Sequence, residues 1–378
     1  MTRDSGLQSG DMLKPGSLSI VSEYDIAANA LLERYGLSDY TIEQICYSEN
    51  HTYRVSRQDE EPVATLRICR PGYRSLKELQ AEIDWLSTID HVVELNGFEI
   101  IKPLPALDGS CVQVVALPSG AVLHGVAFVY MNGVTPDEAD GESMRRLFRR
   151  LGSLAAALHE HAQGLGAAAA VHEHALGPGS ATAARASLVP PIINRPVWDC
   201  DSALGSNAPW GSWRDFAGFT SRERELLECA EARIRCVMDA YGKPLERFGL
   251  IHADMRLANL LVEGDTLKLL DFDDCAYGWH LFDLAASLSF IETRPDVPDL
   301  IDSWLEGYRA ASTLRPLEDA DLAVIPSLIM LRRLQLTAWL ATRHDSDPVE
   351  GFSHEWAKDT IAVAGRYMEG HLCLATGV

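Results

Sequence analysis

Short runs of alternating apolar and polar residues occupy the first third of the chain. Such alternation is typical of strands with one buried face, and polar or Pro/Gly-containing stretches separate the runs. The predicted strands are residues 41–47, 52–57, 63–68, 112–116 and 127–131, with a short helix at 27–35 before them. Between the third and fourth strands, Leu76, Leu79, Ile83 and Leu86 recur at helical spacing and predict a helix over 75–89. This part therefore predicts a small antiparallel-sheet lobe with one main helix.

Helical periodicity dominates the chain from about residue 142 onward. The predicted helices are residues 142–161, 221–241, 300–314, 320–342 and 354–368. Residues 162–215, rich in Ala, Gly, Pro and Trp, are predicted to form an irregular insert among them. The pattern as a whole predicts an α+β fold of two lobes. We divide it into a flexible tail at 1–20, an N-terminal lobe at 21–132 and a larger, mainly helical C-terminal lobe at 133–378.

The most informative polar residues lie in the segment 250–274. His252, Asp254 and Asn259 share one loop, and Asp271 follows a predicted hairpin whose turn contains Gly264. Folding that hairpin brings Asn259 and Asp271, at its two open ends, side by side. Magnesium prefers hard oxygen ligands, few of them from protein and the others from phosphate and water. Asp254 is left to orient and deprotonate a hydroxyl, so the set predicts a phosphoryl-transfer site.

The same residues carry a resemblance to a known family. The motifs are His-x-Asp-x4-Asn at 252–259, Leu-Asp-Phe-Asp-Asp at 270–274 and Asp-Leu-Ala at 283–285. They resemble the aminoglycoside phosphotransferase and choline kinase superfamily, the small-molecule branch of the protein-kinase-like fold. Within this superfamily, the sequences of the motifs are similar to those of the bacterial group of homoserine kinase-like proteins and stress-response Ser/Thr kinases. The resemblance covers about residues 30–345 and implies transfer of the γ-phosphate of ATP to a hydroxyl, with Mg²⁺.

For the C-terminal lobe the resemblance implies roles residue by residue. Asp254 would be the catalytic base, and Asn259 and Asp271 would hold Mg²⁺. His252 and Asp283 would support the catalytic loop. Asp273 replaces the glycine of the protein-kinase Asp-Phe-Gly triplet, which favours the small-molecule branch.

The N-terminal lobe would then be the nucleotide-binding lobe. Arg67 stands where kinases carry the strand lysine that contacts the phosphates, and Glu82 would be its helix partner. Ser48 and Asn50 belong to a glycine-poor loop in the place of the phosphate-covering loop. Residues 128–133 would form the hinge between the lobes. Its Tyr130 and Met131 are predicted to line the adenine ring.

The insert and the C-terminal lobe around it are predicted to bind the acceptor. Trp198, Trp210 and Trp213, with Asp199 and Asp201, would hold an ammonium group by cation–π and charge contacts. Two His-Glu-His triplets, at 159–161 and 172–174, lack the i, i+4 histidine pair of a zinc-binding helix, so no metal is predicted there.

Charge and composition narrow the choice of partners. The net charge of −21 speaks against nucleic acid or an anionic membrane surface, and it permits a cationic acceptor. The eight cysteines form no Cys-x-x-Cys pair and are predicted to be free thiols in a reducing cytoplasm. No apolar stretch approaches the roughly 18 residues of a membrane span. The sequence gives no information on the oligomeric state.

Several functions stay open at this point. We predict a small, amine-bearing acceptor such as homoserine, choline or an aminoglycoside, because Asp271 and Asp283 lie only twelve positions apart and leave no room for a long activation loop. The alternatives are a Ser/Thr protein kinase of the stress-response type and a non-catalytic nucleotide-binding module, the latter because Arg67 replaces lysine. A resistance enzyme for aminoglycosides is a further possibility. The sequence decides neither the acceptor nor the preference for ATP over GTP.

Overall fold

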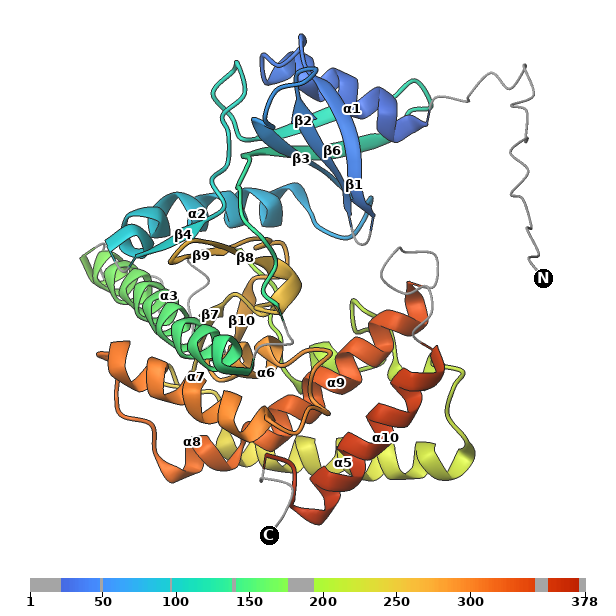
Figure 1. The fold of residues 1–378 in the computed structure, drawn as a ribbon, viewed down its shortest axis with the longest axis vertical. Helices are drawn as coiled ribbons and strands as arrows, with labels where there is room; N and C mark the ends of the chain where they lie inside the picture. The colour runs from blue at the N-terminus through green and yellow to red at the C-terminus, as the bar shows by residue number, and fades with distance from the viewer. Residues whose placement is uncertain are drawn as a thin grey trace, which may run out of the picture.

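The computed structural model describes residues 22–47, 50–95, 97–137, 141–175, 194–343 and 353–373. Figure 1 shows a smaller lobe built on a sheet and a larger lobe built mainly of helices. The sheet has five antiparallel strands in the order β1-β2-β3-β6-β5. Their bounds are β1 (Thr41–Tyr47), β2 (Asn50–Ser56), β3 (Ala64–Cys69), β5 (Val112–Ala116) and β6 (Val122–Val129).

The two faces of this sheet are covered by different helices. Helix α1 (Glu23–Arg34) packs on one face through Leu31, which lies so close to Gly125 of β6 that a Cβ there would be 2.4 Å from it. Helix α2 (Leu76–Leu95) packs on the other face with Val126 and Phe128. Alternate residues of β6 therefore belong to separate apolar clusters, as expected for a strand buried on both faces.

The helices of the larger lobe surround the site. Their bounds are α3 (Gly141–Ala175), α4 (Cys200–Leu204), α5 (Ser221–Tyr241), α6 (Phe282–Ser287), α7 (Val297–Ala311), α8 (Asp319–Ala323), α9 (Ile325–Thr342) and α10 (Ser353–Glu369). Helices α3 and α7 lie side by side (Figure 1). A Cβ on Gly152 of α3 would lie 1.9 Å from the Trp304 carbonyl oxygen, and one on Gly307 of α7 would lie 1.8 Å from that of Arg149. The two glycines thus allow backbone contact between these helices.

Two small sheets position the predicted site between the lobes. Strands β8 (Leu260–Glu263) and β9 (Thr266–Leu269) form the predicted hairpin, and β4 (Phe98–Ile100) adds a parallel strand to β9. Strand β7 (Phe248–Ile251) pairs with β10 (Ala276–Trp279). The loop from β7 to β8 carries Asp254, and the loop from β9 to β10 carries Asp271, so the pairings bring the two loops together.

Most predicted elements are confirmed, and the strand bounds of β1 and β5 agree to the residue. Three corrections are needed. Helix α3 does not end at residue 161 but continues to Ala175, so the first part of the predicted irregular insert is helical, in keeping with the high helix propensity of its alanines. The predicted helix at 320–342 is two helices, α8 and α9, with Pro326 in the first turn of α9. Strands β4, β7 and β10 were not predicted.

Two earlier predictions fall on residues 1–20 and Ser48, which lie outside the described residues. The division into domains at residue 132 stays a prediction. None of the described helices combines the length and the apolar character that a membrane crossing requires.

Candidate active site

Asp283 stabilises the loop between β7 and β8, which carries Asp254, through hydrogen bonds to its backbone. Its buried carboxylate accepts hydrogen bonds from the backbone N–H groups of His252, at 3.2 Å, and Ala253, at 2.7 Å. Ala253 has a left-handed backbone, with φ of 68°, which the second of these bonds stabilises. The same carboxylate lies 2.9 Å from Nε2 of the buried His159. The structure thus places Asp283 where the sequence predicts a supporting residue.

His252 connects the two site loops. Its Nε2 lies 2.9 Å from the Leu270 carbonyl oxygen, and its Nδ1 lies 3.2 Å from the backbone nitrogen of Asp254. Burial lowers the pKa of His252, which keeps the ring neutral at pH 7. A neutral ring donates from Nε2 and accepts at Nδ1, as both contacts require. His252 therefore fixes the distance between the Asp254 loop and the Asp271 loop.

Beneath this loop, His280 stacks on His159 with ring centroids 4.7 Å apart. Nε2 of His280 is buried without a hydrogen-bond partner among the described residues. Burial, with the neighbouring His159 and Arg315, holds the pKa of His280 well below its usual value. The unfolded chain therefore binds this proton more readily than the folded chain does, and protonation favours unfolding.

We expect the stability of the protein to fall as the pH drops below about 6.5, the ordinary pKa of histidine. His280 alone would contribute on the order of 1 kcal/mol of lost stability between pH 7.5 and 5.5. Urea unfolding of the native protein and of His280→Gln at both pH values measures this. The variant should be less stable at pH 7.5 but should lose less stability on acidification. An equal loss in both proteins would contradict the assignment of His280.

Two guanidinium groups surround the carboxylate of Asp254. Its Oδ1 is ion-paired with Nη2 of Arg332, and its Oδ2 accepts a hydrogen bond from Nε of Arg256 at 3.2 Å. Burial alone would raise the pKa of Asp254, but Arg332 and Arg256 outweigh it and hold the pKa below its usual value. Asp254 is thus ionised at neutral pH. It can align an incoming hydroxyl and accept its proton.

The predicted metal ligands lie next to Asp254. Asn259 donates from Nδ2 to Oδ2 of Asp254 at 2.7 Å and to its carbonyl oxygen at 2.9 Å, so neither bond uses the Asn259 amide oxygen. The backbone N–H of Leu270 donates to the Asn259 carbonyl at 2.9 Å, so the two ends of the hairpin do meet. The side chain of Asp271 is 47% exposed. The backbone of this residue is left-handed, with φ of 54°.

The donor atoms at this point fit a divalent cation. Although nearly half of its side chain is exposed, partial withdrawal from water and the nearby carboxylate of Asp273 raise the pKa of Asp271 to about 7. Oδ1 of Asp273 is buried and accepts no hydrogen bond from any described residue. Within the described ranges, no three His, Cys, Asp or Glu side chains could hold an ion by themselves. Mg²⁺ takes few protein ligands; held by Asn259 and Asp271, it would neutralise phosphate oxygens.

The N-terminal lobe supplies a buried ion pair. Arg67 donates from Nη1 and Nη2 to the two carboxylate oxygens of Glu82, at 2.9 and 2.6 Å, as the sequence predicts. The Arg67 guanidinium also lies over the ring of Phe128 and 3.8 Å from Oδ1 of Asp271. It therefore faces the predicted metal ligand, where a nucleotide phosphate would pass.

The side chain of Asn50, predicted to contact phosphate, makes its hydrogen bonds within the protein in this structure. Its Nδ2 donates to Oδ2 of Asp273 at 2.9 Å, and its Oδ1 accepts from the backbone N–H of Arg70 at 3.2 Å. The side chain is thus occupied within the protein, because it links the N-terminal sheet to the Asp271–Asp274 loop. A polar residue at the start of a strand can serve either contact, and only the fold decides between them.

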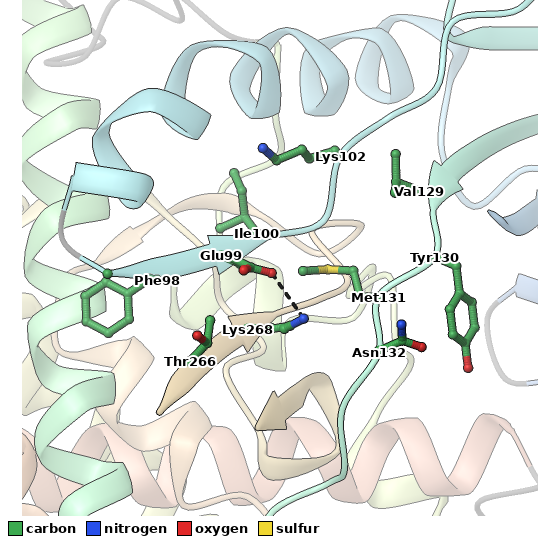
Figure 2. A pocket seen from close by; sticks show the side chains of 11 residues that line it. Phe98, Glu99, Ile100, Lys102, Val129, Tyr130, Met131, Asn132, Thr266 and Lys268 are labelled. Atoms are coloured by element: carbon green, nitrogen blue, oxygen red, sulfur yellow. Dashed lines mark ion pairs between the residues drawn. The ribbon is translucent and has the colours of Figure 1, made fainter. Parts of the chain in front are cut away.

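The hinge residues Tyr130 and Met131 border a cavity of about 500 Å³ (Figure 2). Its other walls include Asn132, Lys102 and Lys268, and Lys268 forms an ion pair with Glu99 at 3.2 Å. Neither Arg67 nor Asp271 lines this cavity. The predicted contact of Tyr130 and Met131 with an adenine ring therefore stays a prediction.

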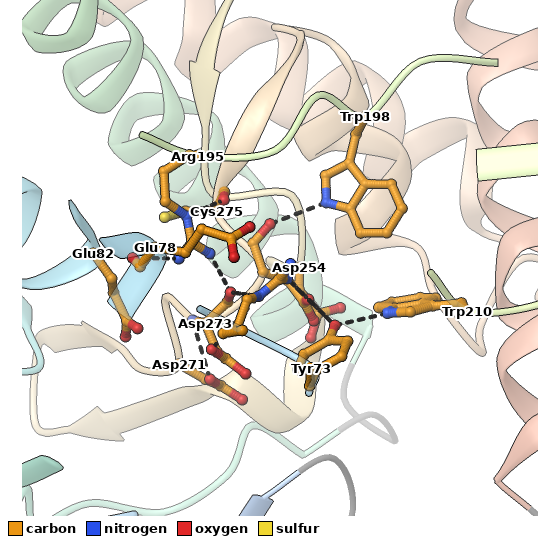
Figure 3. Close-up of polar contacts among 12 residues, drawn as sticks. Tyr73, Glu78, Glu82, Arg195, Trp198, Trp210, Asp254, Asp271, Asp273 and Cys275 are labelled. Atoms are coloured by element: carbon orange, nitrogen blue, oxygen red, sulfur yellow. Dashed lines mark hydrogen bonds and ion pairs between the residues drawn. The ribbon is translucent and has the colours of Figure 1, made fainter. Parts of the chain in front are cut away.

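A second cleft opens beside Asp254. Its lining includes the carboxylates of Asp271, Asp273 and Asp274 together with a set of mostly aromatic residues, namely Trp210, Phe290, Leu336 and Trp339. Tyr73 donates to Oδ1 of Asp274 at 2.5 Å and accepts from Nε1 of Trp210 at 2.8 Å (Figure 3). Arg74 donates to the same oxygen of Asp274 at 2.6 Å. Burial raises the pKa of Asp274 to about 6 against the opposing effect of Arg74.

Comparison with known proteins decides the family. The family model described as "Phosphotransferase enzyme family" matches residues 47–319, which is more than half of the chain. The chain belongs to this family. It is accordingly a kinase that acts on hydroxyl groups of small molecules, and its fold is the protein-kinase-like α+β fold predicted above.

Individual phosphotransferases agree over nearly the whole chain. A solved microcompartment-associated aminopropanol kinase is 31% identical, with a TM-score of 0.75, and the match covers 93% of this chain and 99% of that one. The amicoumacin kinase of Bacillus subtilis (strain 168) is 23% identical over 87% of this chain and 88% of its own length. An amicoumacin kinase solved with AMP-PNP, Ca²⁺ and its acceptor has a TM-score of 0.65 at 17% identity, covers 93% of this chain and 95% of its own, and supports the fold alone.

The insert of this phosphotransferase reaches the site differently from the prediction. Asp199 caps α4 and forms an ion pair with Lys243 at 2.5 Å, and Asp201 pairs with Arg235 at 2.7 Å. Neither lines the cleft beside Asp254, and both carboxylates are paired within the protein, so their predicted contact with an ammonium group stays a prediction. Aspartates just before a helix are good caps, which is the role the fold uses.

Three residues of the insert contact the predicted site. Arg195 donates to the carbonyl oxygens of Asp273 and Cys275 and so anchors the insert to the segment that follows Asp271 (Figure 3). Trp198 donates to the Asp274 carbonyl at 3.1 Å, and Trp210 lines the cleft. The third predicted tryptophan, Trp213, instead donates to Glu231 away from this cleft.

The sequence analysis also missed Arg332 and Asp274 as site residues. Asp274 was visible as the last residue of the Asp-Phe-Asp-Asp motif, yet nothing in the motif shows that it turns to the acceptor side. Arg332 stands beside Arg333 in an otherwise apolar helix. That was an available signal, because a charge inside an apolar helix must have a buried partner.

Proposed function

We propose that this phosphotransferase transfers the γ-phosphate of ATP, with Mg²⁺, to the hydroxyl of a small amino alcohol. The observation that carries the proposal is the position of two carboxylates in one cleft, Asp254 and Asp274. Asp254 would receive the hydroxyl. Asp274 would receive the ammonium group of the same molecule.

The surroundings of Asp274 support an ammonium ligand. Both hydrogen bonds to its carboxylate, from Tyr73 and Arg74, end on Oδ1. No described residue donates to Oδ2, so that oxygen is available to a ligand. Trp210, Trp339 and Phe290 line the same cleft, and aromatic faces attract a desolvated cation. An ammonium group would also stabilise the ionised form of Asp274, whose pKa is raised to about 6.

The size of the cleft favours a small acceptor. Its free space is about 40 Å³, room for roughly three waters, since one water occupies roughly 10–15 Å³ on this measure. An acceptor with a few heavy atoms thus needs the cleft to widen less than an aminoglycoside would. The 31% identity to an aminopropanol kinase is consistent with a short amino alcohol.

The resemblance to homoserine kinase-like and stress-response kinases makes homoserine an acceptor to test, since it also carries an amine and a hydroxyl. The proposed place of action is the cytoplasm, which supplies ATP and keeps thiols reduced, and all eight cysteines are free in the structure.

The experiment measures Mg²⁺-dependent ATP consumption with 1-amino-2-propanol, ethanolamine, choline, homoserine and an aminoglycoside. Propane-1,2-diol, which has no charge, is the matched comparison. The native enzyme should prefer the amino alcohol in kcat/KM, and Asp274→Asn should reduce that preference by about 30-fold or more, as expected for loss of a buried charge pair. Asp302→Asn, on the exposed side of α7, is the control. An unchanged preference in Asp274→Asn would exclude Asp274 as the ammonium site.

A further inference from the structure

Two arginines contact Asp254, and the structure uses them in different ways. Arg332 is only 2% exposed, and each of its nitrogens has a protein partner. Nε donates to Ser289 at 3.0 Å, Nη1 donates to Gln335 at 3.2 Å, and Nη2 pairs with Asp254. Its guanidinium also lies over the ring of Trp210. Arg332 is therefore a fixed positioning residue.

Arg256 has no such fixed surroundings. Its side chain is 27% exposed, and only Nε is bonded, to Oδ2 of Asp254 at 3.2 Å. No described residue accepts a hydrogen bond from its Nη1 or Nη2. Arg256 lines the same cleft as Asp254 and Asp271, and the carboxylate of Asp271 lies close enough to act on its charge. Its free nitrogens are thus available to a group that enters between Asp254 and Asp271.

The charges around Arg256 favour the binding of an anion next to its guanidinium group. Burial would lower the pKa of Arg256, but the carboxylates of Asp254 and Asp271 raise it, so its charge lies near both. Arg332 already neutralises Asp254, and a cation on Asp271 would neutralise that carboxylate. Arg256 would then carry an uncompensated charge in a partly desolvated cleft, which is costly unless an anion joins it.

We propose that Arg256 is a catalytic residue that contacts the phosphoryl group during its transfer. The inference rests on the proposed function only in taking ATP as the donor, not on the choice of acceptor. In the step, the acceptor oxygen forms a bond to the γ-phosphorus while the bond to the leaving oxygen of ADP breaks. The acceptor proton passes to Asp254 and then to water. Arg256 donates from Nη1 and Nη2 to the equatorial oxygens, where the negative charge is spread in the transition state.

The test uses full-length protein and a transition-state mimic. Binding of ADP with Mg²⁺ is measured with and without aluminium fluoride, which imitates the phosphoryl group in transfer and requires no acceptor. The native protein should bind the fluoride complex much more tightly than ADP alone. Arg256→Gln should reduce that gain by about 30-fold or more and change the affinity for ADP alone by less than about threefold. Arg256→Lys should be intermediate, and Arg309→Gln on α7 should equal the native protein.

A second measurement decides the case in which the fluoride complex binds no better than ADP in the native protein. Turnover of Arg256→Ala with ATP, using water or an amino alcohol as acceptor, is followed with and without added guanidinium at millimolar concentration. We expect kcat to fall about 100-fold or more, with KM for ATP within threefold, and guanidinium to restore part of kcat. Equal loss of ADP binding and fluoride-complex binding, or no rescue in a correctly folded variant, would overturn the proposal. If no amino alcohol is phosphorylated, the proposed acceptor is rejected. The binding of the fluoride complex and the turnover of ATP with water would still test Arg256.

Discussion

Replacement of Asp254 by alanine or asparagine is expected to reduce turnover by at least about a thousandfold while the protein still folds. The carboxylate is the only described acidic group that Arg332, Arg256 and Asn259 hold together in the cleft. Either substitution removes both the charge that aligns the acceptor hydroxyl and the base that takes its proton. Arg332 would keep its bonds to Ser289 and Gln335 but would lose its charge partner, so both variants should fold with a lower unfolding temperature than the native protein.

The measurement is kcat and KM for ATP and for the best acceptor, with circular dichroism and thermal unfolding as checks on the fold. Asp302→Asn provides the matched exchange of carboxylate for amide away from the site, and it should behave as the native enzyme. A folded Asp254→Ala protein with native turnover would remove Asp254 from the mechanism. An Asp254→Asn protein with native turnover would show that the charge is not required.

The central part of the site could be predicted from the sequence because it is local. Asn259 and Asp271 are separated by one hairpin, and the pairing of Leu260 with Leu269 closes it. Once the turn at Gly264 forms, the chain has almost no other way to arrange these two residues. The supporting contacts of His252 depend on the same hairpin. The Arg67–Glu82 pair was also accessible, since both residues lie on elements with a clear apolar pattern.

The acceptor side could not be predicted in the same way because its residues meet only through the tertiary fold. Arg332 and Asp254 are 78 positions apart, and Trp210 reaches Tyr73 across 137 positions. Local patterns instead pointed to Asp199 and Asp201, which lie beside tryptophans in the sequence but serve as a cap and a surface ion pair in the fold. Neighbourhood in sequence was a poor guide to neighbourhood in the cleft.

The missed strands have a related physical reason. Strand β4 has three residues, and β7 and β10 have four each. Runs this short show no period, and they are strands only because partners elsewhere in the chain complete their hydrogen bonds. They matter for the site nevertheless, because β7 leads into the loop that carries Asp254 and β10 follows the loop that carries Asp271. The pairing of these two strands holds the two loops together.

Replacement of Asp271 by asparagine is expected to abolish the dependence of nucleotide binding on Mg²⁺ and to lower kcat/KM by about a thousandfold. The substitution removes the charged oxygen ligand but keeps the shape of the side chain. Asparagine also tolerates the left-handed backbone of this position, with φ of 54°, better than alanine does. ATP binding is measured by calorimetry at several Mg²⁺ concentrations, and Asp239→Asn on α5 serves as the control.

The same variant should be more stable than the native protein in the absence of metal and nucleotide. The pKa of Asp271 is raised to about 7 by its partial withdrawal from water and by Asp273, so ionising this carboxylate opposes folding, by an amount that its 47% exposure to water reduces. That cost grows as the pH rises from about 4, the ordinary pKa of aspartate, to about 7. Asparagine carries no charge, so the unfolding temperature of Asp271→Asn should exceed the native value most clearly at pH 7.5 and approach it near pH 4.

Lower stability at pH 7.5 together with unchanged Mg²⁺-dependent binding would mean that Asp271 is a structural residue and that the metal is held elsewhere. A gain in apo stability with loss of the Mg²⁺ effect would mean that the carboxylate is kept, at a cost to the empty protein, for the cation it binds.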